Sequence, residues 1–365
     1  MDVCVPLNPE NKKFLRLIYL ICQSGDDADD DKNWFDNGRF EAPENESNTI
    51  ESGCQRISLA AMMVQYFYWK TTGKTFRLEF DQQERKEENR RPIVYRFLIK
   101  DHDHHKLWQM NQKELWRLIA NQLMNSTLAT NDCKYLAFCS FSRFASKSNE
   151  PIWLPSKQVD GYVSLGGDGL ALLSTHCLYC WPETIDEINE RFEDQRPVNV
   201  NRFMNDSNNR NTRSGCLATT FGAVVHELGH VFGLAHRSTG IMSDEFNFID
   251  EFFRKNNHHS NVCRRWWTEE DLTILNLNPW FDPCLSADDN ENVFNITTDD
   301  DNNRRILHSK YDIRLLEYRH IHTNLVKKSK IFNKSSIKSI QINWIDKQSK
   351  LYILDCNGNS KTFYL

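Results

Sequence analysis

Residues 226–236, His-Glu-Leu-Gly-His-Val-Phe-Gly-Leu-Ala-His, form the stretch from which most of this protein can be predicted. If the stretch is helical, His226 and His230 lie four residues apart on one face, where two imidazoles can reach a single ion. Gly233 then marks the point where the backbone leaves the helix, because glycine adopts a left-handed turn without steric penalty. The turn can bring His236 round as a third ligand.

Three imidazole ligands leave the fourth position of a tetrahedral zinc ion open, which is the arrangement of a catalytic site and not of a structural one. Glu227 follows the first ligand directly, so its carboxylate can act as a general base there without binding the metal. We therefore expect one zinc ion per chain. Two alternatives stay open: surface histidines on an ordinary amphipathic helix, and a zinc site that does not catalyse, against which only the presence of Glu227 argues.

The stretch resembles the HExxHxxGxxH signature of the metzincin zinc endopeptidases, and residues 239–243, Thr-Gly-Ile-Met-Ser, resemble their methionine-bearing turn. The resemblance implies that Met242 lies beneath the zinc and supports the histidines without binding metal. Within this clan, residues 221–253 look most like a poorly characterised eukaryotic family of zinc metallopeptidases. The sequence departs from the astacins, since no tyrosine follows Met242, and from the reprolysins, since no cysteine precedes it.

The resemblance implies a zinc-dependent endopeptidase that acts on a peptide or protein substrate, with Glu227 as general base. It also implies a substrate-binding edge strand just before the zinc helix, and Gly169, Leu170 and Ala171 are similar to that strand. A turn beside a core strand explains these residues equally well. Residues 246–253 would form a wall of the pocket beyond the scissile bond. The alternative function is that of a non-catalytic, zinc-stabilised binding protein acting through a C-terminal β domain.

A length of 365 residues suits one large domain and one smaller domain. We predict an α+β fold in which a metzincin-like catalytic domain, a twisted mixed sheet with the active-site helix, precedes a small β-rich domain. The predicted parts are an N-terminal strand and acidic loop (1–50), the peptidase domain (51–284), an acidic linker (285–303) and a small all-β accessory domain (304–365). The sequence does not indicate which ligand the accessory domain would bind.

Composition limits the other partners. The chain has 45 Lys and Arg against 50 Asp and Glu, a net charge of −5, and no basic stripe, so a nucleic-acid partner is not expected. No segment is apolar enough to span a bilayer. Residues 14–22 are apolar, but the segment is short, contains Arg16 and lacks a cleavage site, so we predict a strand and not a signal peptide. Eleven cysteines, an odd number, favour free thiols and a cytoplasmic location.

Two further clusters have chemistry of their own. Residues 101–105, Asp-His-Asp-His-His, could bind metal, but no regular helix spaces them, and a solvated loop is favoured. Cys177 and Cys180 have redox or zinc-knuckle spacing, yet no second cysteine pair stands at the distance of a zinc ribbon, and structural thiols are favoured.

Hydrophobic periodicity predicts helices at 58–70, 111–123 (capped by Asn111), 184–192 (capped by Thr184) and 216–234, a last packing helix near 266–275, and strands at 14–21, 76–80, 94–99, 135–141, 313–316, 337–344, 351–354 and 362–365. Asn357-Gly358 predicts the turn between the last two strands.

Overall fold

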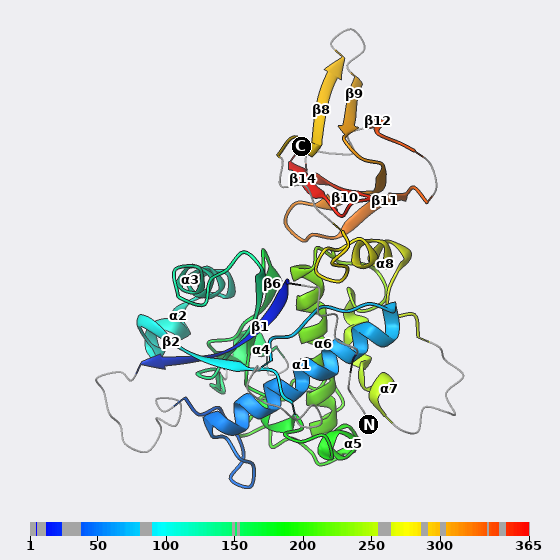
Figure 1. The fold of residues 1–365 in the computed structure, drawn as a ribbon. Helices are drawn as coiled ribbons and strands as arrows, with labels where there is room; N and C mark the ends of the chain where they lie inside the picture. Colours follow the sequence, from blue (N-terminus) through cyan, green and yellow to red (C-terminus); the bar gives the residue numbers. More distant parts are fainter. Residues whose placement is uncertain are drawn as a thin grey trace.

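The structure is a computed structural model, and Figure 1 shows its fold. It describes residues 5, 12–23, 38–80, 90–147, 150–151, 154–254, 264–285, 291–299, 304–333, 336–342 and 348–364. The fold is α+β, as predicted: helices pack on a mixed sheet, and antiparallel sheets make up the C-terminal region. The acidic residues of the predicted N-terminal loop, 26–31, lie outside the described residues.

The central sheet has five strands in the order β2-β1-β3-β7-β6. Their bounds are β1 Phe14–Gln23, β2 Val94–Asp103, β3 Cys133–Cys139, β6 Ser164–Gly167 and β7 Leu170–Ser174. The first four strands in this order are parallel, and β6 runs antiparallel to β7 at the edge. The apolar segment near the N-terminus is therefore an inner strand of this sheet, as the sequence predicted.

The predicted position of the substrate-binding edge strand was wrong. Leu170 and Ala171 belong to β7, whose backbone pairs with β3 on one side and β6 on the other. Gly169 lies in the turn between β6 and β7, with φ +92°. The hairpin places β6 on the outer side of β7, so β6, residues 164–167, is the edge strand at this side of the sheet. Sequence pattern did not separate the two, because both are short and only glycines and Asp168 mark the turn between them.

Helices cover both faces of this sheet. On one face lie α1 (Ile50–Thr72) and α6 (Arg213–Val231), which carries His226 and His230, and on the other lie α2 (His104–Gln109) and α3 (Gln112–Met124) (Figure 1). Successive strand residues alternate between the two cores: Leu17 and Tyr19 pack with α1, whereas Ile18 packs with α3. The capping box predicted at Asn111 is present.

Shorter elements complete this part of the chain. They are β4 Arg143–Phe144, α4 Pro155–Gln158, β5 Val159–Asp160, η3 Leu178–Cys180, α5 Glu187–Glu193, η4 Asp244–Phe248, α7 Asp250–Phe253 and α8 Glu269–Asn276. Two local predictions fail. The cap of α5 is Asp186, without a side-chain bond, and not Thr184. Residues 76–80 form only isolated bridges, through Leu78 and Phe80, and no strand.

The C-terminal region contains two antiparallel sheets, in the orders β11-β10-β13-β14 and β12-β9-β8. After η6 (Glu291–Val293), the strands are β8 Phe294–Asp299, β9 Arg304–Ser309, β10 Ile313–His320, β11 Val326–Ile331, β12 Ser339–Ile342, β13 Ser349–Asp355 and β14 Ser360–Tyr364. Strand β8 lies in the segment predicted as linker, so the antiparallel structure begins earlier than residue 304. The turn predicted at Asn357-Gly358 is confirmed, with Gly358 at φ +84°.

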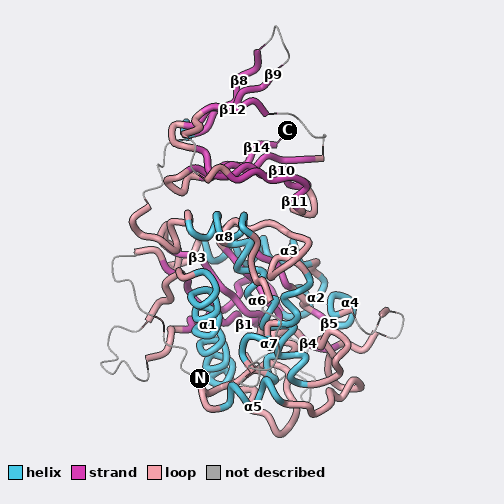
Figure 2. The backbone as a smooth tube through the Cα atoms, turned by 90° about the vertical axis from the view of Figure 1, so that its right-hand side faces the viewer, coloured by secondary structure: helices cyan, strands magenta, loops and turns pink. Residues whose placement is uncertain are grey.

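The four-stranded C-terminal sheet packs on the part of the chain that precedes it. Leu315, Tyr352 and Leu354 on one of its faces share a core with Ile274 and Leu275 of α8. Its other face packs against the three-stranded sheet. Figure 2 shows β10 and β11 lying directly over α8. The apolar core is therefore continuous from the central sheet into the C-terminal region. Within the described residues, no helix is both long and apolar enough to cross a membrane.

Candidate active site

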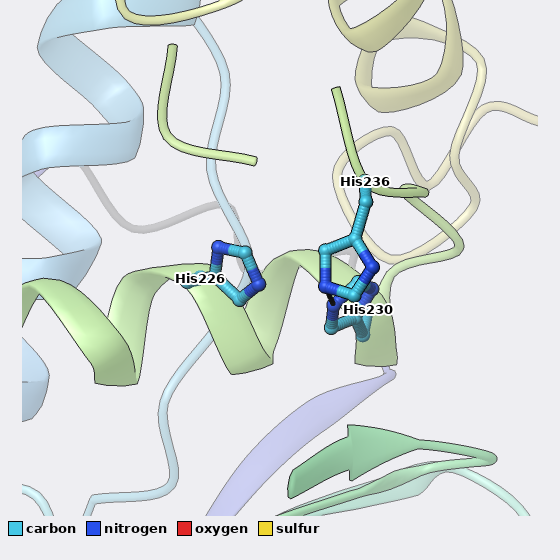
Figure 3. A group of neighbouring side chains, drawn as sticks. All are labelled: His226, His230 and His236. Atoms are coloured by element: carbon cyan, nitrogen blue, oxygen red, sulfur yellow. Dashed lines mark hydrogen bonds between the residues drawn. The ribbon is translucent and has the colours of Figure 1, made fainter. Parts of the chain in front are cut away.

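The three predicted zinc ligands come together at the end of α6 (Figure 3). His226 and His230 project from the helix, and Gly233 ends it with φ +92°. The backbone N–H of Leu234 then donates to the carbonyl of Gly229 at 2.9 Å, and the chain turns back to bring in His236. Among the described His, Cys, Asp and Glu side chains, these three form the one group whose ligand atoms, all within 4.8 Å of one another, could hold an ion.

Hydrogen bonds fix the orientation of each imidazole. Nδ1 of His226 lies 2.8 Å from the backbone carbonyl of Ile241. Nδ1 of His230 lies 3.0 Å from the carbonyl of Leu234, and Nδ1 of His236 lies 2.6 Å from that of Thr323. Since a carbonyl oxygen can only accept, each Nδ1 carries the proton and each Nε2 keeps a lone pair. This is the tautomer that binds metal through Nε2.

The spacing of two of these atoms also fits a cation. The Nε2 atoms of His230 and His236 lie 3.0 Å apart. Both nitrogens present lone pairs, because both protons are on Nδ1, and two lone pairs at this distance repel unless a positive charge lies between them. Three neutral imidazole nitrogens suit zinc, which takes such ligands in tetrahedral geometry. The donor set therefore fits the predicted ion.

Burial keeps the two helical histidines neutral. It lowers the pKa of His226 to about 4, and burial together with the neighbouring His226 lowers the pKa of His230 to about 4. A metal that binds a protonated imidazole must first displace the proton. At neutral pH these two imidazoles carry no proton on Nε2, so none has to be displaced. The site is thus arranged for metal uptake at pH 7.

The metal-free protein is expected to lose stability as the pH falls from about 6.5 to about 4. Unfolded histidines bind protons below a pKa of about 6.5, while the folded ones stay neutral to about 4, so the unfolded state gains more protons in this window. Each of the two histidines can account for a loss of at most roughly 3 kcal/mol in the free energy of unfolding. Urea unfolding of chelator-treated protein across this window measures the effect. His226→Asn should show a shallower decline, and parallel curves for both proteins would contradict this origin.

The side chain of Glu227 extends from α6 to the edge strand β6. Its carboxylate accepts hydrogen bonds from the backbone N–H of Gly166, at 2.6 Å, and from the hydroxyl of Ser164, at 3.2 Å. Burial raises the pKa of Glu227 above its usual value, although these hydrogen bonds and the nearby histidines oppose the shift. Roles for Ser164 and Gly166 were not predicted from the sequence. The glycine pair at 166–167 was their only signal, and it suggested a turn.

Gly166→Ala is expected to weaken the packing of the edge strand on α6. A Cβ at this position would collide with the backbone carbonyl of Glu227, and backbone cannot move aside as a flexible side chain can. We expect a loss of roughly 1–3 kcal/mol in the free energy of unfolding. Urea denaturation measures it, with Gly167→Ala as control, because a Cβ at Gly167 meets no atom within 4 Å. Equal stability of the two variants would refute the close approach.

Met242 lies beneath the zinc helix and is completely buried. Its sulfur packs so closely under Gly229 that a Cβ there would collide with it. The surrounding turn is closed by two backbone hydrogen bonds, from Arg237 N to Met242 O at 2.8 Å and from Ser243 N to Gly240 O at 3.0 Å. The methionine therefore packs the turn that follows His236 against the helix that carries His226 and His230.

An open hollow of about 540 Å³ lies beside the histidines. Its walls include His226, His236 and Phe246, whose ring centroid is 5.1 Å from that of His226. Of the predicted pocket wall at 246–253, only Phe246 lines this hollow. Phe253 is instead buried and stacks on Phe192 at 5.2 Å.

The two other clusters noted in the sequence have structural roles. Asp103 accepts a hydrogen bond from Lys106 N at 2.9 Å and so caps α2, which makes residues 101–105 the junction of a strand and a helix. Cys177 and Cys180 are buried beside Cys216, and burial raises the pKa of the Cys177 and Cys180 thiols. Protonated, buried thiols are poor nucleophiles, as expected for packing residues.

Known proteins that are similar to this chain are described as peptidases. A family model described as "Putative peptidase family" matches residues 3–270. The chain belongs to this family. It is also similar to a "Putative zinc metalloproteinase" of Saccharomyces cerevisiae, 32% identical over 101 residues, which are 27% of this chain and 14% of the yeast protein. A protein of the same description from Schizosaccharomyces pombe is 32% identical over 104 residues, 27% of this chain and 17% of that protein. The matched segments thus span less than a fifth of either relative.

Proposed function

We propose that this chain is a zinc endopeptidase of the metzincin type that cleaves peptide or protein substrates. The observation that carries the proposal is the convergence of three oriented histidine Nε2 atoms at the helix that also bears the buried Glu227. Membership of a peptidase family and the names of the two yeast relatives support it. His226, His230 and His236 would hold one zinc ion, with Met242 beneath them.

Zinc at this position supplies a Lewis acid that makes water nucleophilic at neutral pH and polarises a peptide carbonyl. Glu227 accepts the proton that the attacking water loses and hands it to the nitrogen of the departing amine. Its burial favours this exchange, because a raised pKa brings the carboxyl closer to the pH at which it must both take and release a proton. Gly166 and Ser164 hold the carboxylate in place through the bonds described above.

The edge strand β6 offers a way to bind an extended substrate. Within the described residues, it pairs with β7 on one side only. A peptide that adds to the other side would lie beside Glu227. It would pair with the main-chain groups of residues 164–167 that are still open, because the N–H groups of Ser164 and Gly166 already donate to Gln112 and Glu227. Such pairing is largely independent of the substrate side chains, so selectivity would arise in the hollow lined by Phe246.

The proposal is tested on purified protein by elemental analysis and by incubation with a degenerate peptide library read by mass spectrometry. We expect one zinc per chain and cuts inside peptides that stop on chelation and return when zinc is restored. Zinc without any cleavage would favour the non-catalytic binding protein instead. Absence of zinc from the wild-type chain would reject the site itself.

A further inference from the structure

We propose that the turn between β10 and β11, residues 320–326, positions the third zinc ligand, so that the metal site is complete only when the C-terminal β region is docked. The inference rests on the proposed function, since it concerns the same metal site. The β region, which the sequence predicts only as an accessory domain without a defined ligand, would then have a task in that site. The matched family segment ends at residue 270, so this turn lies outside it.

His236 is bonded to this turn through its side chain and its backbone. The backbone N–H of His236 donates to the carbonyl of Asn324 at 3.1 Å, and its carbonyl accepts from the N–H of Val326 at 3.1 Å. These bonds form a parallel bridge between His236 and Leu325. The Nδ1 atom of the same histidine lies 2.6 Å from the carbonyl of Thr323. Both the position of the residue and the rotation of its ring are therefore set by the β region.

The other two ligands differ in this respect. His226 and His230 are fixed by the helix that carries them and by the carbonyls of Ile241 and Leu234, which belong to the peptidase part. Without the turn, those two would keep their partners, whereas His236 would lose all three of the hydrogen bonds that join it to residues 323–326. Zinc affinity depends on such outer partners, whose loss commonly costs a factor of 10–100.

Buried charges attach the base of the turn to the chain on both sides of His236. Arg319, near the end of β10, donates to the carbonyl of Gly233 at 3.0 Å, where the zinc helix ends. Glu317 of the same strand pairs with Arg237, the residue directly after the ligand. Arg319 and Glu317 also pair with each other at 2.6 Å. The segment of the third ligand is thus held at both ends by one strand of the β region.

The direction of the critical carbonyl depends on one backbone conformation. Asn324 has φ +55°, in the left-handed region that asparagine and glycine tolerate and β-branched residues do not. Its N–H donates to the carbonyl of His320 at 2.9 Å, and Nδ1 of His320 accepts from the N–H of Thr323 at 3.2 Å. A residue that cannot adopt this φ at position 324 would therefore redirect the carbonyl of Thr323.

The test compares zinc affinity in the full chain for Asn324→Val and Asn324→Gly, by competition with a chromophoric chelator. We expect Asn324→Val to raise the zinc dissociation constant about tenfold or more, in line with loss of an outer partner, and Asn324→Gly to stay within about threefold of wild type. Asp101→Val is the matched control, because Asp101 also has φ +61° but lies in β2, at the sheet edge opposite β6. Circular dichroism and melting of the metal-free proteins establish that each variant folds.

A second background shows whether the turn acts through His236. In His236→Ala protein the third ligand is gone, so adding Asn324→Val should change the remaining zinc affinity by less than about twofold. An equal loss in both backgrounds, or unchanged affinity of Asn324→Val in the wild-type background, would overturn the proposal. Failure of the proposed function is a different outcome, since wild-type protein would then take up no zinc or cleave no peptide.

Discussion

Glu227→Gln is expected to lower kcat/KM for peptide cleavage by about 10²–10⁴ while zinc stays bound at one ion per chain. Glutamine has the shape of glutamate, and its amide oxygen can still accept the hydrogen bond that Gly166 N–H now donates to the carboxylate. It cannot accept a proton from water. The cleft and the metal site are therefore retained, and the proton transfer is lost.

The measurement pairs elemental analysis with initial rates on a peptide identified in the library. Glu150→Gln serves as control, because this carboxylate is partly exposed and, among the residues that the structure describes, its ion pair is with Lys157, at 3.8 Å. This substitution removes one negative charge at a position far from the site, so the rate of peptide cleavage should stay unchanged. A Glu227→Gln enzyme within tenfold of wild type would exclude Glu227 as the base. Loss of zinc from this variant would instead point to a structural effect.

The convergence of the three histidines was predictable because its geometry is local. His226 and His230 are one helical turn apart, and Gly233 permits the reversal that brings in His236, so three imidazoles within eleven residues need no knowledge of the rest of the fold. Met242 follows closely enough to belong to the same local pattern. Helical spacing and glycine conformations are properties that a sequence states directly.

The partners of the site were not predictable in this way. Thr323 contributes a backbone carbonyl, which any residue type carries, and it stands 87 residues from the histidine that it orients. Gly166 acts through an N–H and through the absence of a Cβ, and nothing in the sequence distinguishes it from a glycine in a turn. Contacts made by backbone atoms across long separations leave no residue pattern, so they appear only in the folded chain.

The same limit applies to the strands of the C-terminal region. Inner strands β10 and β13 are apolar and were expected, whereas β8, β9 and β11 were not. Strand β11 reads Val-Lys-Lys-Ser-Lys-Ile and forms an edge with three exposed lysines. Charged residues on edge strands prevent unwanted pairing, and they also hide the strand from any test based on hydrophobicity.

Glu317→Ala is expected to destabilise the protein by about 3–5 kcal/mol and to weaken zinc binding with it. Glu317 is fully buried and pairs with both Arg237 and Arg319, while Asp271 takes the second bond of Arg237 at 2.9 Å. The four charges balance. Removal of the glutamate would leave two buried guanidinium groups facing one carboxylate, and an uncompensated buried charge is costly.

Urea unfolding of the metal-free protein and chelator competition measure the two effects separately. The control is Glu44→Ala, which breaks the exposed pair of Glu44 with Arg202, 3.6 Å apart, and should cost less than about 1 kcal/mol. If Glu317→Ala were as stable as this control, the buried cluster would not hold the β region on the peptidase part. Arg237 directly follows His236, so a displacement of β10 should be transmitted to the proposed third ligand. If Glu317→Ala were unstable yet bound zinc as tightly as wild type, the metal site would not depend on that attachment.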